Sequence, residues 1–307
     1  MKLCFMFPGQ GSQKVGMGKD LVDKFDRAKQ LFEQANDILS RDIARLCFEG
    51  PDEELKETSN TQPALFVVEA ALCDILNELE ITPSFTMGHS LGEYGALYGA
   101  GVLSFDDGLR LVARRGELMA QAGKTAPGAM AAVINLPKEK IREVIANEVD
   151  GVVVCANENT PVQTVISGEV DAIAAARKKL CEAGAKRVID LPVSGAFHSP
   201  LMQSAADEFA GILKDAAFSS PRCPVITNVT ARAETDPEKL RDLLVQQLVS
   251  PVKWVDSIEF LISKQPDTCC EVGPGNVLIG LAKKINRELN VVPCGTVENL
   301  FSLQSSQ

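Results

Sequence analysis

The most constraining feature of this sequence is Gly-His-Ser-Leu-Gly at residues 88–92, which sets a serine between two glycines. It follows an apolar, strand-like run at residues 81–87 and precedes a small-residue, helix-like run at 91–101. A strand that turns sharply into a helix at G-x-S-x-G exposes its serine hydroxyl at the helix N-terminus. Backbone N–H groups there favour negative charge, so Ser90 is a candidate nucleophile beside a candidate oxyanion site. The alternative is a glycine-rich turn whose serine caps the helix.

A serine nucleophile requires a general base, most often histidine, and this chain has only two histidines. His89 adjoins Ser90, and neighbouring side chains in a turn point in different directions. By elimination, we expect His198 to be the base. It lies in a loop that follows a strand-like run at residues 187–191, and loops at strand ends often carry catalytic groups. The alternative is a hydrogen-bonded structural histidine.

The N-terminal strand-like run at residues 3–7 leads directly into a loop, Pro-Gly-Gln-Gly-Ser-Gln, at residues 8–13. Glycines on both sides of Gln10 allow its backbone to approach a ligand closely. Its N–H and that of Leu91 are therefore candidate donors to an oxyanion. No Lys-Ser or Lys-Thr follows at the spacing of a phosphate-binding loop, and Lys14 occupies the third glycine position of the dinucleotide motif, so nucleotide binding is disfavoured.

The length of 307 residues exceeds the usual size of a single hydrophobic core, which favours two domains. Residues 129–191 read as strand, helix, strand, strand, helix, strand, the order of a ferredoxin-like unit, with the second strand expected at 152–156. The remainder alternates strands with longer helices, as in a parallel sheet covered on both faces. The sequence predicts an α/β protein: a large α/β-hydrolase-like domain at 1–125 and 193–307 with a parallel sheet, and an inserted ferredoxin-like small domain at 126–192. The cleft between them is the expected active site.

Composition narrows the function classes. A formal charge of −10 argues against nucleic-acid binding, which needs clustered lysine and arginine. Nine cysteines without a C-x-x-C pair indicate reduced thiols in a cytoplasmic protein. No apolar run is long enough to span a membrane. Two histidines and scattered cysteines argue against a metal site.

Six motifs follow one another along the chain: GQGSQ at 9–13, GHSLGEY at 88–94, RRGELM at 114–119, GAFHSPLM at 195–202, QLVSPVKW at 247–254 and EVGPGNVL at 271–278. Together they resemble the malonyl-CoA:acyl carrier protein transacylases of bacterial type II fatty acid synthesis. The resemblance covers nearly the whole chain. It implies malonyl-CoA and acyl carrier protein as partners and no separate cofactor, since the coenzyme A thioester is a substrate.

The resemblance also implies a role for each of seven residues. They are Ser90 as the acylated nucleophile, His198 as its base, the backbone amides of Gln10 and Leu91 as the oxyanion hole, Arg115 as the ligand of the malonyl carboxylate, the backbone carbonyl of Gln247 as the partner that orients the imidazole, and Asn159 as a residue near the substrate.

An arginine suits a malonyl group because its planar guanidinium binds a carboxylate through two parallel hydrogen bonds, which lysine cannot form. Arg115 lies within an amphipathic, helix-like pattern at residues 106–121. The pattern alone does not choose between Arg114 and Arg115, and an arginine there is otherwise a surface charge. The resemblance favours Arg115.

Three alternatives stay open. The nearest is a transferase for another extender unit, or the malonyltransferase subunit of a malonate decarboxylase. The second is a serine hydrolase, although no motif marks an acidic third residue between Ser90 and His198. The third is a non-catalytic module that binds the carrier. Because an acidic carrier is repelled by a negative chain, a docking surface requires local basic residues. Candidates are residues 177–179, residues 186–187, and Lys283, Lys284 and Arg287, each group being otherwise a solvated face.

Overall fold

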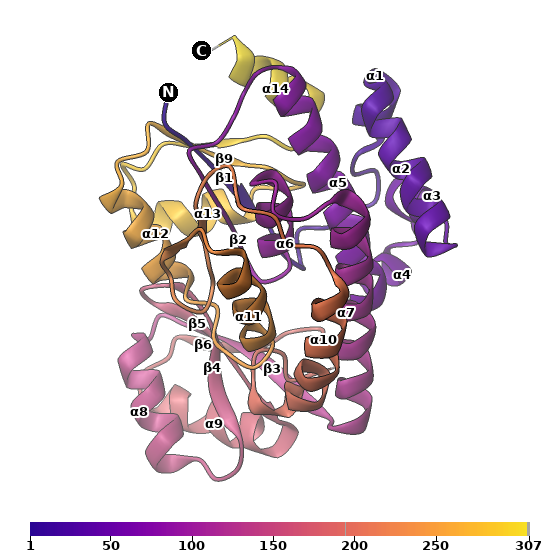
Figure 1. The fold of residues 1–307 in the computed structure, drawn as a ribbon. Coiled ribbons are helices and arrows are strands. Elements are labelled where there is room, and N and C mark those ends of the chain that lie inside the picture. Colours follow the sequence, from indigo (N-terminus) through magenta and orange to yellow (C-terminus); the bar gives the residue numbers. More distant parts are fainter. Residues whose placement is uncertain (194, 306–307) are drawn as a thin grey trace.

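A computed structural model describes residues 1–193 and 195–305 (Figure 1). In this part of the chain, strands form one six-stranded and one four-stranded sheet. The strands are β1 (Leu3–Phe7), β2 (Phe85–Gly88), β3 (Gly128–Ile134), β4 (Val153–Thr160), β5 (Gln163–Glu169), β6 (Arg187–Asp190), β7 (Val225–Ile226), β8 (Ala233–Glu234), β9 (Thr268–Glu271) and β10 (Val291–Pro293).

Helices surround both sheets. They are α1 (Lys19–Lys24), α2 (Asp26–Leu39), α3 (Ile43–Glu49), α4 (Asp52–Lys56), α5 (Thr58–Glu78), α6 (Gly92–Gly99), α7 (Phe105–Thr125), α8 (Lys138–Glu148), α9 (Val170–Glu182), the 3₁₀ turn η1 (Pro200–Met202), α10 (Gln203–Asp215), α11 (Pro237–Gln247), α12 (Trp254–Ser263), α13 (Val277–Ile285) and α14 (Val297–Gln304). None of the helices in the described residues is both long and apolar enough to cross a bilayer.

The larger sheet has the order β10-β9-β1-β2-β7-β8, in which only the edge strand β8 runs antiparallel to its neighbour. Side chains of the central strand β1 alternate between two hydrophobic cores. Phe5 and Phe7 belong to one core, and Cys4 and Met6 belong to the other, as the two-residue period of a strand requires. Burial on both faces is the normal state of a parallel sheet. Strands β1 and β2 end side by side at Phe7 and Gly88, where the loops of interest begin.

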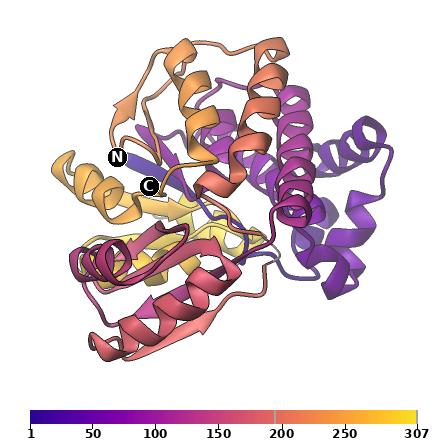
Figure 2. The ribbon, with the colours of Figure 1, turned by 90° about the horizontal axis from the view of Figure 1, so that it is seen from below.

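The smaller sheet has the order β4-β5-β3-β6 and is antiparallel throughout. Ala131 and Val133 of β3 pack into a core under α8 and α9, whereas Met130 and Ala132 face the core of the larger part. Figure 2 shows this pink segment to one side of the helices around the larger sheet. The α/β class with a ferredoxin-like second unit is confirmed. The smaller sheet spans residues 128–190, within the segment 126–192; the division into two domains stays a prediction.

Two strand boundaries differ from the sequence prediction. The strand expected at residues 81–87 is only β2, because Pro83 lacks an N–H for the sheet and the residues before Phe85 stay outside it. The strand expected to stop at residue 156 continues to Thr160. Its pairing with β5 shifts register twice, between residues 155 and 157 and between 158 and 160, so its alternation is interrupted. This extension carries Asn159.

Candidate active site

The turn between β2 and α6 brings Ser90 to the surface of a cavity. Ser90 has a left-handed φ of 52°, a strained conformation that is rare for residues with a side chain. A Cβ atom added to Gly88 would lie 2.0 Å from the carbonyl carbon of Gly92, and one added to Gly92 would lie 2.0 Å from the carbonyl oxygen of Phe7. Neither glycine has room for a side chain. The sequence G-x-S-x-G is therefore a packing requirement of this turn.

His198 meets Ser90 from a loop more than one hundred residues later. Its Nε2 lies 2.8 Å from Ser90 Oγ, and its Nδ1 lies 2.8 Å from the backbone carbonyl of Gln247. Because a carbonyl only accepts, Nδ1 carries the proton, and Nε2 accepts from the serine hydroxyl. Burial, followed by the charge of Arg115, lowers the pKa of His198 to about 3. The imidazole is therefore neutral at pH 7 and able to take a proton.

The two backbone amides expected to form an oxyanion hole line the same cavity. Gln10 follows β1 and Leu91 follows the serine, and both border the space beside Ser90 Oγ. Within residues 1–193 and 195–305, neither N–H donates a hydrogen bond to the protein. The Gln10 side chain instead donates to Thr58 Oγ1 at 3.1 Å, which leaves its backbone amide free. Two free N–H groups beside a nucleophile are suited to a developing oxyanion.

The structure separates Arg115 from Arg114. Helix α7 turns Arg114 toward solvent, where it pairs with Glu117 and Glu208. Arg115 is 1% exposed and points into the cavity.

Each hydrogen bond of the Arg115 guanidinium goes to a neutral oxygen. Nη1 donates to Gln62 Oε1 at 2.9 Å, and Nη2 donates to Gln247 Oε1 at 2.9 Å and Ser90 Oγ at 3.1 Å. Among the described residues, no carboxylate forms an ion pair with this buried cation. Because a buried charge without a counter-ion is costly, the site favours an anionic guest.

Several polar groups that the sequence did not indicate support this arrangement, among them the side chain of Gln247. The Gln247 side chain donates from Nε2 to the carbonyl of Ser90 at 3.0 Å and to Glu93 Oε2 at 2.8 Å. Asn228 Oδ1 accepts from the N–H of Ser90 at 2.7 Å, and the Asn228 N–H donates to Glu93 at 3.0 Å. Burial raises the pKa of Glu93 to about 7, although these hydrogen bonds and Arg115 act to lower it. Glu93 follows the serine motif directly, but nothing in the sequence marks Asn228.

Asn159 contacts the other histidine. Its Oδ1 lies 2.8 Å from His89 Nε2, and the His89 ring packs at 5.4 Å from that of Trp254. His89 is thus held away from the serine hydroxyl, in agreement with the choice of base. Asn157, on the same strand as Asn159, borders the cavity. A contact between Asn159 and substrate stays a prediction.

The cavity at Ser90 is small and lies between the two sheets. Its volume is about 110 Å³. Besides the reacting groups, its lining includes Arg115 and Met119 of α7, Met130 of β3, Leu191 and Phe197. A larger space of about 660 Å³ lies elsewhere, and none of the seven predicted site residues borders it.

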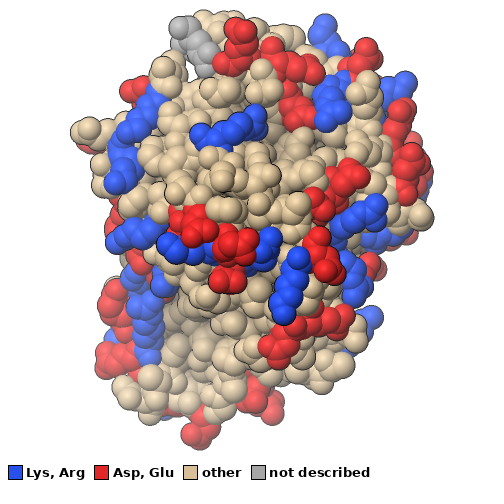
Figure 3. All heavy atoms as spheres, viewed as in Figure 1, with Lys and Arg blue, Asp and Glu red and all other residues tan. Residues whose placement is uncertain are grey.

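Charges of both signs alternate over the face of the molecule in Figure 3, and a mixed band crosses its middle. The basic residues expected at 177–179 are partly neutralised, because Arg177 pairs with Asp190 and Lys179 lies 3.4 Å from Glu148. The docking surface for a carrier protein stays a prediction.

Comparison with known proteins identifies the family. The model of the acyl transferase domain matches residues 4–299. The chain belongs to the acyl transferase family. A malonyl CoA-acyl carrier protein transacylase of Bacillus subtilis (strain 168) is 43% identical over 301 residues, which cover 97% of this chain and 95% of that protein.

Solved structures of the family share the fold. An acyl carrier protein S-malonyltransferase from Vibrio cholerae O1 biovar eltor str. N16961 superposes with a TM-score of 0.96 at 43% identity, covering 99% of this chain and 100% of the other. A malonyl-transacylase in complex with its type II PKS acyl-carrier protein superposes with a TM-score of 0.96 at 39% identity, with full coverage of both chains.

Proposed function

We propose that this chain transfers malonyl from malonyl-CoA to the phosphopantetheine thiol of acyl carrier protein, through a malonyl ester of Ser90, and so supplies fatty acid elongation. The names of the relatives support this substrate pair. The coenzyme A thioester enters as a substrate, and the reaction needs no further cofactor. We assign the activity to the cytoplasm.

The observation that carries the proposal is the buried guanidinium of Arg115. It lies 3.1 Å from the Ser90 hydroxyl, and its hydrogen bonds among the described residues go only to neutral oxygens, with the Glu93 carboxyl nearby but not paired with it. An acyl group that ends in a carboxylate supplies the missing anion, whereas an acetyl group leaves the cation uncompensated. The site therefore favours a dicarboxylic acyl group of malonyl size.

The first half-reaction forms the acyl-enzyme. Ser90 Oγ attacks the thioester carbonyl, and His198 Nε2 takes the hydroxyl proton. The N–H groups of Gln10 and Leu91 stabilise the tetrahedral oxyanion. When the carbon–sulfur bond breaks, His198 returns the proton to the sulfur of coenzyme A, which leaves as the free thiol.

The second half-reaction runs the same steps in reverse with a new thiol. His198 takes the proton of the phosphopantetheine thiol, whose sulfur attacks the malonyl ester. The carbon–oxygen bond to Ser90 then breaks, and the proton returns to the serine. The carbonyl of Gln247 holds the imidazole in one tautomer throughout and, being neutral, stabilises the imidazolium less than a carboxylate would.

Intact-mass measurement after mixing with malonyl-CoA tests the proposal. We expect one malonyl adduct on the wild type and none on Ser90→Ala. Variants Cys269→Ser and Cys270→Ser serve as controls and should keep the adduct, because both thiols are buried away from the cavity. Adduct retained by Ser90→Ala would refute the serine mechanism. An adduct that passes to water faster than to carrier thiol would make the protein a hydrolase.

A further inference from the structure

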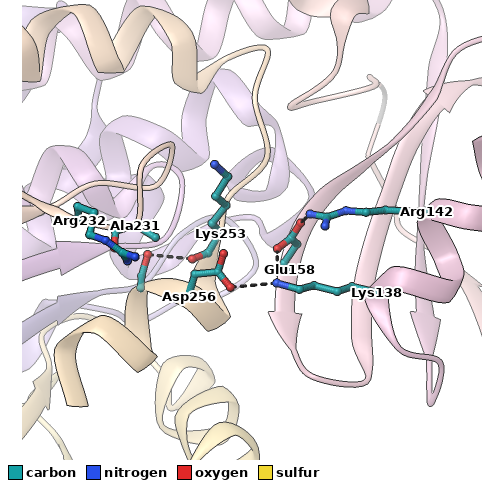
Figure 4. Close-up of polar contacts among 8 residues, drawn as sticks. Lys138, Arg142, Glu158, Ala231, Arg232, Lys253 and Asp256 are labelled. Carbon is teal, nitrogen blue, oxygen red and sulfur yellow. Dashed lines mark hydrogen bonds and ion pairs between the residues drawn. The ribbon is translucent and has the colours of Figure 1, made fainter. Parts of the chain in front are cut away.

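Four charged side chains gather where the four-stranded unit meets the rest of the molecule (Figure 4). Lys138 and Arg142 come from α8, Glu158 from β4 and Asp256 from α12. Lys138 Nζ lies 3.1 Å from Glu158 Oε2 and 2.9 Å from Asp256 Oδ1. Arg142 pairs with the other oxygen of Glu158. Among the described residues, Lys138 and Asp256 make the sole ion pair between the four-stranded unit and the rest of the chain.

Because Glu158 is buried, its carboxylate needs the cations of this cluster close to it. Its side chain is only 1% exposed, while that of Lys138 is 20% exposed. A buried carboxylate must keep its cations, because removing one leaves an uncompensated charge. Burial lowers the pKa of Lys138, but the hydrogen bonds to Asp256 and Glu158 outweigh it and raise that pKa overall. Lys138 is therefore held charged between two carboxylates that belong to different parts of the molecule.

The backbone is bridged at the same residue. The N–H of Glu158 donates to the carbonyl of Val252 at 2.9 Å, and the N–H of Val252 donates to the carbonyl of Ala156 at 2.8 Å. These are the residues at which β4 shifts register against β5. The end of β4 thus stays paired with β5 across the two shifts, while its free edge pairs with the segment that leads into α12. We call this contact between β4 and the segment that leads into α12 the joint. Apolar contacts are not directional, so the polar contacts fix the register of β4 against that segment.

This joint touches the serine turn from two directions. Asn159, next to Glu158, lies 2.8 Å from His89 Nε2. Lys253, next to Val252, donates its N–H to the carbonyl of Asn228, whose side chain accepts from the N–H of Ser90. A shift of β4 along α12 therefore displaces Asn159, which contacts His89, relative to Lys253, which is linked to Ser90 through Asn228.

We propose that Lys138 is a positioning residue: by joining Glu158 to Asp256 it holds β4 against α12, and so keeps the four-stranded wall of the cavity closed over the acyl group on Ser90. This proposal rests on the malonyl transfer proposed above. The acyl ester must survive until a carrier thiol arrives, and one wall that excludes water comes from Met130 and Leu191, across the joint from Ser90. Loosening the joint admits water, whereas the contacts of Ser90 with His198 and of His198 with Gln247 lie within the six-stranded part and persist.

Lys138→Met tests this role, since it keeps the length of the side chain and removes its charge. The matched control is Lys140→Met on the same helix, since Lys140 pairs with the exposed Glu143 one turn away and with no other carboxylate of the described residues. We measure amide hydrogen exchange over peptides that contain Glu158 and Val252, and the ratio of malonyl transfer to hydrolysis. Lys138→Met should speed exchange in both peptides and lower the ratio roughly 2- to 30-fold, the range for residues that couple parts of a protein. Lys140→Met should change neither.

Two further variants keep the test informative if Lys138→Met folds poorly. Asp256→Asn removes the partner in the other part, and its effect should not add to that of Lys138→Met in the double variant. Lys138→Arg retains the charge and should restore most of the ratio. An unchanged ratio with unchanged exchange in folded Lys138→Met, or an equal effect of Lys140→Met, overturns the proposal. If the wild type transfers no malonyl, the proposed function fails, while the exchange data still decide whether Lys138 holds the joint.

Discussion

The six-stranded part of the molecule and the four-stranded part contribute differently to the same cavity. The first holds its reacting groups in a dense hydrogen-bond network, in which Gln247 alone contacts His198, Arg115, Glu93 and Ser90. The second adds mainly apolar walls, and its polar attachments among the described residues include one backbone bridge, one ion pair and the contact of Asn159 with His89. The chemistry is thus built into one part, and the closure of the site depends on the joint between them.

Variants in the hydrogen-bond network and variants at the joint should therefore have different effects on the reaction. Changes in the hydrogen-bond network should slow the chemical steps: a change at His198 for every acyl group, and a change at Arg115 for malonyl alone. Changes at the joint should leave those steps nearly intact and alter the fate of the acyl-enzyme.

The largest expected loss follows His198→Ala. The variant lacks the base 2.8 Å from Ser90 Oγ, so the rate of acylation should fall by roughly 10² to 10⁴, as expected for positioned general-base catalysis. His89→Ala is the matched control and should retain far more activity, since its ring contacts Asn159 and Trp254 instead. Stopped-flow measurement of acylation separates the two. The choice of base is wrong if folded His89→Ala loses acylation and His198→Ala keeps it.

A smaller and more selective loss is expected for Arg115→Ala. Charge-assisted hydrogen bonds to a carboxylate contribute about 1.5 to 3 kcal/mol, so kcat/KM for malonyl-CoA should fall roughly 10-fold to over 100-fold. Turnover of acetyl-CoA should stay level or rise, because the uncompensated cation is gone. Arg115→Lys should rescue only part of the loss, as a point charge lacks the planar fork.

The control for this comparison is Arg114→Ala, because Arg114 is exposed and paired with Glu117 and Glu208. It should affect both substrates little. An equal loss for malonyl-CoA and acetyl-CoA in Arg115→Ala would make that residue structural.

The smallest expected effect concerns pH. With a pKa lowered to about 3, His198 stays neutral between pH 5 and 8 in the free protein and should give no inflection near its ordinary value of 6.5. Glu93, with a pKa raised to about 7, should give the inflection in kcat/KM near neutrality, and Glu93→Gln should remove it. An inflection near pH 6.5 that survives in Glu93→Gln would show that His198 titrates normally.

Stability should follow the same shift of His198. Because its folded pKa lies below the unfolded value, the unfolded state binds more protons between about pH 6.5 and 3, and the contribution of His198 to stability falls as the pH falls through that window. Glu93 acts in the opposite sense between its ordinary value of 4.5 and about 7.

The parts of the site that could be predicted from the sequence lie in a recognisable motif or belong to a residue type that is rare in this chain. Ser90 lies in a motif fixed by tight glycine packing, and His198 is one of two histidines. The fold class followed from the periodicity of strands and helices. Arg115 needed the resemblance, because two adjacent positions on a helix fit the same amphipathic pattern.

Contacts between side chains that lie far apart in the sequence could not be predicted from it. Glu93, Asn228 and the side chain of Gln247 meet around the serine from distant positions in the chain, and no spacing relates them. The same holds for the extension of β4, since a strand that shifts register twice against its partner has no constant period. Such features depend on packing between elements, which local patterns do not encode.

The backbone of Ser90 has a consequence for how this protein can change over time. A residue with a side chain at a φ of 52° costs the fold of order 1 kcal/mol, and glycine at that position would relieve the strain. Glycine, however, has no hydroxyl to carry the acyl group. Selection for heat resistance alone would favour replacement of this residue, so its persistence in a lineage would be a record of selection for catalysis.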